Sequence, residues 1–108
     1  MMEILLWIEQ KNLQKVKDIL LKDDVVSRAS ITFKEAKIMT NKEGYYSYIS
    51  GTEEQCVRAL EIVKLKNEKT GEIVELAREV KEEERKEVIN KIKEEERKAM
   101  EGFGGIFG

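Results

Sequence analysis

The sequence predicts an α+β fold in which helices pack on one small sheet. A strand followed by a helix occurs near the start, as EILLWIE and then LQKVKDILL, and again within GYYSYISGTEEQCVRALEIVK, residues 44–64. Continuous or alternating apolar runs indicate the strands, and apolar residues three or four apart indicate the helices. At 108 residues the chain is one domain that can bury a core, though with little margin.

The first strand is expected at residues 4–8, where every side chain is apolar. Such a run is typical of a central strand that is covered on both faces. Asn12 is placed to cap the following helix. The buried stripe of that helix is expected at Leu13, Val16 and Leu20.

Residues 25–40 are expected to form the second strand. Ala29, Ile31 and Phe33 alternate with polar residues and should face the core. Further along, the alternation slips by one position, which predicts a β-bulge or bend near residues 34–36.

Residues 41–44 (NKEG) predict a turn, and residues 45–49 a third strand. Thr52 and Gln55 have the spacing of a capping box, so a helix should begin there. The buried side of this helix is expected at Cys56, Ala59 or Leu60, and Val63.

Residues 67–71 (NEKTG) predict a turn, and residues 72–77 predict a fourth strand, although their apolar positions also fit a helical stripe. A long charged helix is expected at residues 79–101. The chain then divides into an α+β core at 1–78, this helix, and a Gly- and Phe-rich tail at 102–108.

The long helix has few apolar residues and should bury only a narrow strip. The expected i,i+4 ion pairs are Glu82–Lys86, Glu87–Lys91 and Glu94–Lys98. The tail carries Phe103, Ile106 and Phe107 among four glycines, so we expect it to dock on a protein surface; a disordered end is the alternative.

Charged residues make up 39% of the chain, but the net charge is only −2, with no His and no Pro. This composition indicates ion-pair networks of the kind common in thermophile proteins, or simply a soluble, helix-rich protein. Acidic residues accompany nearly every basic cluster, so no nucleic-acid partner is expected. The absence of a long apolar run or signal peptide and the single cysteine predict a cytoplasmic protein without a membrane partner.

Most catalytic constellations are missing. Without His there is no Ser-His or Cys-His nucleophile and no imidazole metal ligand, and one cysteine cannot build a zinc cluster. No Gly-rich phosphate loop is present. We therefore expect no enzyme activity, no cofactor and no metal.

Three weaker signals remain, each with a structural alternative. Cys56 near a helix start could be a reactive thiol, or it could fill the core. Residues 50–52 could hold an anion, although Glu53 and Glu54 would repel it. Residues 23–24 (Asp-Asp) could bind Ca²⁺ or Mg²⁺, or could form an ordinary loop.

Aromatic residues gather on the central strands, at Trp7, Tyr45, Tyr46 and Tyr48. Two helices can cover only one face of a four-stranded sheet, so the other face should be open and apolar. Such a face is typical of a partner surface, with aromatic core packing as the alternative. The candidate interface residues are Trp7, Tyr46, Tyr48, Phe103, Ile106 and Phe107.

The element order strand-helix-strand-strand-helix-strand is the ferredoxin-like pattern, here with an added C-terminal helix. The opening EILLWIEQKNLQKVKDILLKDDV and the later KTGEIVELAREV resemble segments of nitrogen regulatory PII proteins, over about two thirds of the chain. The resemblance implies a trimeric signalling scaffold with ligand clefts between subunits. The long loop of that family is replaced by the turn at 41–44, and its Gly-Asp-Gly-Lys nucleotide segment is missing, so no ATP or 2-oxoglutarate site is carried over.

These observations lead to a non-catalytic, PII-like regulatory or interaction protein that self-associates through its sheet face, as a trimer by analogy. A small-ligand sensor that binds a nucleotide or amino acid between subunits is the alternative. Two further alternatives are an enzyme that uses only carboxylates, Lys and Tyr, and a docking peptide for another protein formed by the C-terminal helix and the apolar tail at residues 102–108.

Overall fold

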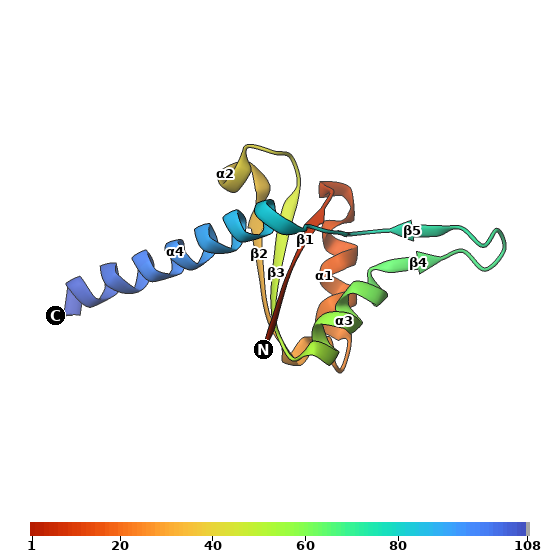
Figure 1. The fold of residues 1–108 in the computed structure, drawn as a ribbon, viewed down its shortest axis with the longest axis horizontal. Helices are drawn as coiled ribbons and strands as arrows, with labels where there is room; N and C mark the ends of the chain where they lie inside the picture. Colours follow the sequence, from red (N-terminus) through yellow and green to blue (C-terminus); the bar gives the residue numbers. More distant parts are fainter. Residues whose placement is uncertain (108) are drawn as a thin grey trace.

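The structure is a computed structural model that describes residues 1–107, with side chains described for residues 1–100. It is mixed α and β, with antiparallel strands and a C-terminal helix (Figure 1). The elements are β1 Met2–Ile8, 3₁₀ turn η1 Gln10–Asn12, α1 Leu13–Lys22, 3₁₀ turn η2 Val26–Arg28, β2 Ser30–Glu35, α2 Ala36–Thr40, β3 Tyr45–Gly51, α3 Glu53–Ile62, β4 Lys64–Lys66, β5 Ile73–Glu75, β6 Arg78–Glu79 and α4 Glu82–Phe107.

The central sheet has the strand order β2-β3-β1-β6, and every neighbouring pair is antiparallel. β1 and β3 pair along their whole length, from Met2 opposite Gly51 to Ile8 opposite Tyr45. The predicted first and third strands and their central position are therefore confirmed.

Helices α1 and α3 cover one face of the sheet and enclose the larger core cluster. As predicted, Ala29, Ile31 and Phe33 of the β2 region pack against it. The capping box at the start of α3 is confirmed, because Thr52 Oγ1 accepts from Gln55 N at 3.1 Å and Gln55 Oε1 accepts from Thr52 N at 2.9 Å. The buried residues of the cluster are Ile4, Leu6, Ile8, Val16, Leu20, Val26, Ile49, Cys56, Ala59, Val63, Leu76 and Ala77.

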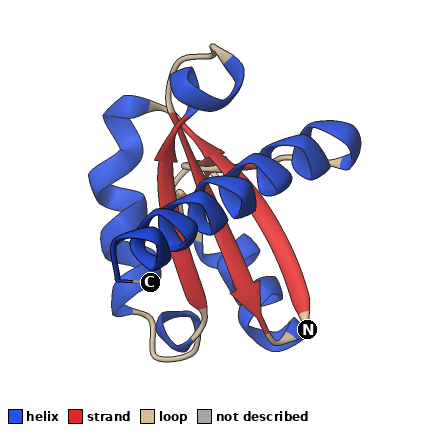
Figure 2. Cartoon of the chain, turned by 90° about the vertical axis from the view of Figure 1, so that its left-hand side faces the viewer, coloured by secondary structure: helices blue, strands red, loops and turns tan. Residues whose placement is uncertain are grey.

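The expectation of an open second face is wrong, because α4 lies across that face (Figure 2). The narrow apolar strip Val88, Ile89 and Ile92 is enough to cover the central strands, since the outer strand β2 presents Thr32 and Lys34 on this side. The second core cluster comprises Leu5, Ala36, Met39, Tyr46, Tyr48, Val80, Val88, Ile89 and Ile92, with Trp7 packed at its edge.

The second strand is shorter than expected. β2 ends at Glu35, and residues 36–40 form the helix α2 rather than the end of a strand. The slip in alternation therefore marks the start of a helix and not a β-bulge: Ala36 and Met39 are one helical turn apart and both are buried. The helix ends at Asn41, which adopts the left-handed conformation with φ 61°.

The expected fourth strand at 72–77 is also corrected. Residues 73–75 are extended, which excludes the helical alternative there, but they pair with β4 in a separate two-stranded sheet. The fourth strand of the central sheet is β6, which pairs with Leu6 and Trp7. β6 consists of Arg78 and Glu79. The sequence pattern placed residue 78 at the end of the α+β core and residue 79 at the start of the long helix.

Two helix boundaries differ from expectation. Asn12 precedes α1 but makes no side-chain capping bond, because the chain enters α1 through the helical turn η1. α4 begins at Glu82 and continues to Phe107, beyond the expected end at residue 101. Of the expected ion pairs along it, Glu87–Lys91 is present at 3.2 Å.

Candidate functional site

The structure brings Trp7, Tyr46 and Tyr48 together on the face under α4, whereas Tyr45 packs on the opposite face. Tyr46 and Tyr48 are buried and Trp7 is half-buried. The hydroxyl of Tyr46 lies 3.0 Å from Thr40 Oγ1. The two tyrosines are therefore core residues in the described chain and are inaccessible to a partner while α4 is in place.

Polar contacts hold α4 against this face as well as its apolar strip. Lys93 Nζ donates to Glu3 at 3.1 Å, and Lys91 Nζ donates to the carbonyl of Met39 at 2.6 Å. The hydrogen bond from Lys93 lowers the pKa of Glu3 and raises that of Lys93. Burial raises the pKa of Tyr48, which lies beside the same pair.

The remaining candidate interface residues, Phe103, Ile106 and Phe107, have side chains outside the described part of the chain. Their docking stays a prediction.

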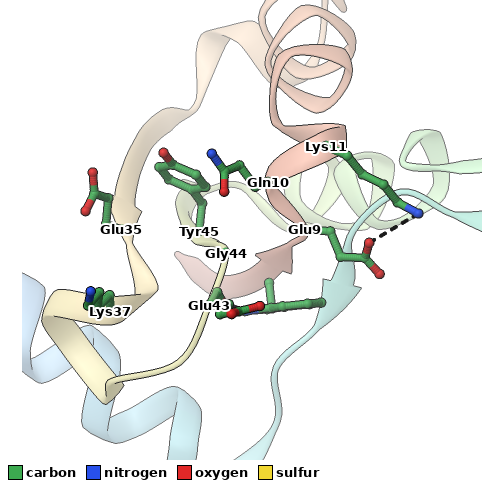
Figure 3. A pocket seen from close by; sticks show the side chains of 9 residues that line it. Glu9, Gln10, Lys11, Glu35, Lys37, Glu43, Gly44 and Tyr45 are labelled. Atoms are coloured by element: carbon green, nitrogen blue, oxygen red, sulfur yellow. Dashed lines mark hydrogen bonds and ion pairs between the residues drawn. The ribbon is translucent and has the colours of Figure 1, made fainter.

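An open cleft lies where β1 ends and β3 begins (Figure 3). Gly44 lines the cleft and has φ +90°, and a Cβ there would lie 2.5 Å from the carbonyl oxygen of Ile8 and 3.0 Å from the Trp7 ring. Trp7 Nε1 donates to the carbonyl of Glu43 at 2.8 Å, and the Arg78 guanidinium lies 5.2 Å from a Trp7 ring centroid. The cleft of about 700 Å³ is lined by Trp7, Glu9, Gln10, Lys11, Glu35, Lys37, Glu43, Gly44 and Tyr45.

The side chains of this cleft can provide charge pairing and stacking. Glu9 and Lys11 form an ion pair at 3.4 Å, and Glu35 and Lys37 stand on the other side (Figure 3). Carboxylates and ammonium groups on either side of an aromatic residue could hold a small zwitterion. Among the residues that the structure describes, no group of three or more His, Cys, Asp or Glu could hold a metal ion.

Two of the weaker sequence signals have structural roles. Cys56 is buried beside Ala59 and Val63, and burial raises the pKa of its thiol, so it fills the core. The carboxylate of Asp23 accepts from the backbone of Val26 at 3.0 Å, which is the main cause of its lowered pKa.

Asp23 is also engaged by the guanidinium of Arg58 at 3.0 Å, so its oxygens serve contacts within the chain. The residues of the candidate anion site are likewise used, since the Thr52 hydroxyl and backbone N–H both serve the capping box. The oxygens of Asp23 and the capping groups of Thr52 are thus engaged within the chain, whereas Asp24, the other residue of the candidate cation site, is exposed.

The feature that sequence patterns did not predict is a hairpin that projects from the body, on the side opposite the far end of α4 (Figure 1). We call residues 64–75, which comprise β4, β5 and the turn between them, the β-arm. In the β-arm Lys64 lies opposite Glu75, Leu65 opposite Val74, and Lys66 opposite Ile73.

All residues of the β-arm are exposed, and three of them carry large apolar side chains among charged and polar neighbours. Leu65, Val74 and Ile73 have 46%, 50% and 65% of their surface accessible. A lone two-stranded hairpin is only marginally stable in water, and exposed apolar side chains on it are typical of a contact surface. Within residues 1–107 neither edge of the β-arm pairs with a further strand.

The base of the β-arm is fixed to the body. Leu76 N donates to the carbonyl of Val63 at 2.9 Å, and both side chains are buried in the larger core cluster. The segment NEKTG, with short runs of equal length on either side (KLK and IVE), was the sequence signal that could have indicated this hairpin.

No protein-family model matches the chain, and no curated protein or solved structure shows significant similarity to it. In the described part of the chain, no helix combines the length and apolar character needed to cross a membrane.

Proposed function

We propose that the chain is a non-catalytic interaction protein that associates with copies of itself through the β-arm. The observation that carries the proposal is the projecting hairpin with Leu65, Ile73 and Val74 in solvent. Removing the exposed hydrophobic side chains of such a hairpin from water would lower the free energy, so a partner that covers them would be stabilised there. The sequence suggested self-association through the sheet face, but α4 covers the tyrosines there, so we place the proposed contact on the β-arm instead.

A ferredoxin-like topology and a PII-like regulatory role are part of this proposal. The antiparallel order β2-β3-β1-β6, with α1 and α3 on one face, supports the topology. The regulatory role rests on the sequence resemblance alone.

The experiment compares the full chain with a variant in which the β-arm is removed. Because Val63 and Leu76 are already hydrogen-bonded across the hairpin, a two-residue Asn-Gly turn can join them in place of residues 64–75. Light scattering after size exclusion, over a range of micromolar concentrations, should show an oligomer for the full chain and a folded monomer for the variant. A full chain that is monomeric throughout this range would contradict the proposal.

A small-ligand sensor is the second candidate, favoured by the cleft with Trp7 and residues of both charges. Thermal-shift screening against amino acids and nucleotides tests it, with Lys37→Ala as the binding-deficient variant. No shift across the panel would remove this candidate.

A further inference from the structure

We propose that the copies associate edge to edge, with β4 of one β-arm pairing antiparallel with β5 of the next, in a closed ring of three or more copies. This inference rests on the proposed self-association and specifies which strands meet. It follows from the direction of the backbone groups, from the charges on the two edges and from the face that carries the apolar side chains.

The backbone groups at the two free edges can be identified from the hydrogen bonds within the hairpin. Asn67 N donates to the carbonyl of Glu72 at 2.7 Å, and Leu76 N donates to that of Val63 at 2.9 Å. Inward and outward groups alternate along an antiparallel pair, so Leu65 and Val74, two positions away, also point their backbone groups inward.

The residues between them therefore present unpaired N–H and C=O groups to the outside. These are Lys64 and Lys66 on the β4 edge, and Ile73 and Glu75 on the β5 edge. A further strand must pair with these residues to continue the ladder. This requirement fixes the phase of any contact between copies.

The charges then select among the pairings that this phase allows. Two β4 edges would place Lys opposite Lys at every hydrogen-bonded pair, because the edge residues are Lys64 and Lys66. Two β5 edges would form no pair of opposite charges. With β4 against β5 of the next copy, Lys64 lies opposite Glu75 and Lys66 opposite Ile73, as they do within one hairpin.

A contact between unlike edges passes from copy to copy, so it must close as a ring or continue as a filament. Two hairpins cannot close in this way, because a four-stranded barrel leaves no room for inward side chains. Three or more hairpins can close, and their Leu65 and Val74 side chains share the face that would then be turned inward. The ring thus covers Leu65 and Val74, whereas Ile73, opposite Lys66, lies on the outer face.

Two proline variants test the proposal, each with a threonine control. Lys66→Pro removes an outward N–H from the β4 edge, and Ile73→Pro removes one from the β5 edge. Neither of these N–H groups donates a hydrogen bond within the hairpin, so the hairpin itself keeps its ladder. Lys66→Thr and Ile73→Thr make similar changes to the side chain but keep the N–H. Each proline should raise the dissociation constant at least ~100-fold, because edge groups at the contact are left unpaired, and each threonine less than ~10-fold.

Mixing the two proline variants gives the sharpest result. The Lys66→Pro chain keeps a working β5 edge and the Ile73→Pro chain a working β4 edge, so an equimolar mixture should form 1:1 heterodimers, seen by native mass spectrometry. Either variant alone should stay monomeric. Self-association of one variant alone, or no heterodimer in the mixture, would overturn the pairing.

The outcomes separate the two proposals. A wild-type chain that is monomeric would remove self-association itself, whereas a wild-type oligomer that all four variants preserve would remove only the edge pairing. A wild-type dimer or an unbounded series of sizes would overturn the ring. If amide exchange shows that proline melts the hairpin, Lys64→Glu should weaken the oligomer and Glu75→Lys in the same chain should restore it; failure to restore would count against the pairing.

Discussion

Ile92 and Ile38 form a matched pair for measuring how firmly α4 covers the sheet. Ile92 is fully buried in the second core cluster, whereas Ile38 on α2 is 70% exposed. Replacing either by Ala removes the same three carbon atoms. Any difference in stability between the two variants therefore reports the burial of Ile92 between α4 and the sheet.

The expected magnitude follows from the atoms removed. Three buried carbons at about 0.8 kcal/mol each, together with the cavity they leave, reduce the free energy of unfolding of Ile92→Ala by about 3 kcal/mol. Ile38→Ala should change it by less than about 0.5 kcal/mol. A domain of this size has roughly 5–15 kcal/mol in total, so the first change is large.

Urea unfolding followed by Trp fluorescence and circular dichroism measures both variants. Trp7 is the only tryptophan and lies at the edge of the cluster under α4, so its emission reports this face. With a slope of about 2 kcal/mol per molar urea, the midpoint of Ile92→Ala should fall by about 1.5 M. All proteins are compared at one concentration, because association raises apparent stability.

A midpoint for Ile92→Ala within experimental error of Ile38→Ala would refute the placement of α4. The second face would then be open, and the interpretation from the sequence, in which the tyrosines meet a second copy, would regain its basis.

Three further predictions concern single groups in the body. Ser47→Ala should raise the free energy of unfolding by up to about 1 kcal/mol, because the buried Ser47 hydroxyl has no hydrogen-bond partner; a loss above about 1 kcal/mol in urea titration contradicts this. Thr52→Ala should reduce it by about 1 kcal/mol through loss of the cap, while Thr52→Ser retains it. The hydrogen bond from Lys93 lowers the pKa of Glu3 from 4.5 in the folded chain. Ionised Glu3 therefore stabilises the fold above pH 4.5, and this stabilisation is lost as the pH falls through the pKa of the folded chain. Glu3→Gln should flatten the acid side of a stability-versus-pH curve, and an unchanged acid side would refute the Glu3–Lys93 contact.

Local signals in the sequence predicted the elements that local chemistry determines. The capping box at Thr52 and Gln55 and the unbroken apolar run at residues 4–8 were both correct. In each case neighbouring residues contain the cause, either a side chain that bonds a nearby N–H or a strand that must be covered on both faces.

The errors fall where a segment's partner is distant in sequence. The pattern predicted a strand at Ala36 and Met39 because two apolar residues cannot define a period, and their burial depends on packing against the sheet and α4. The place of α4 was missed because Val88, Ile89 and Ile92 form too narrow a strip to reveal which surface they cover. The β-arm was missed because its strands have three residues each and pair only with one another.

The positions of α4 and the β-arm together decide which surface is open to a partner. α4 places its few apolar residues on the tyrosines and directs Lys91 and Lys93 to acceptors at the margin of the same face, so this face is already paired within the chain. The β-arm keeps Leu65 and Val74 in solvent and has unpaired backbone groups on both edges. At the β-arm, burial of apolar surface and completion of the hydrogen-bond ladder would both favour association with a second copy. Association at the sheet face would first require α4 to be displaced, with loss of the packing of Ile92 and its neighbours, so the β-arm is the more favourable contact.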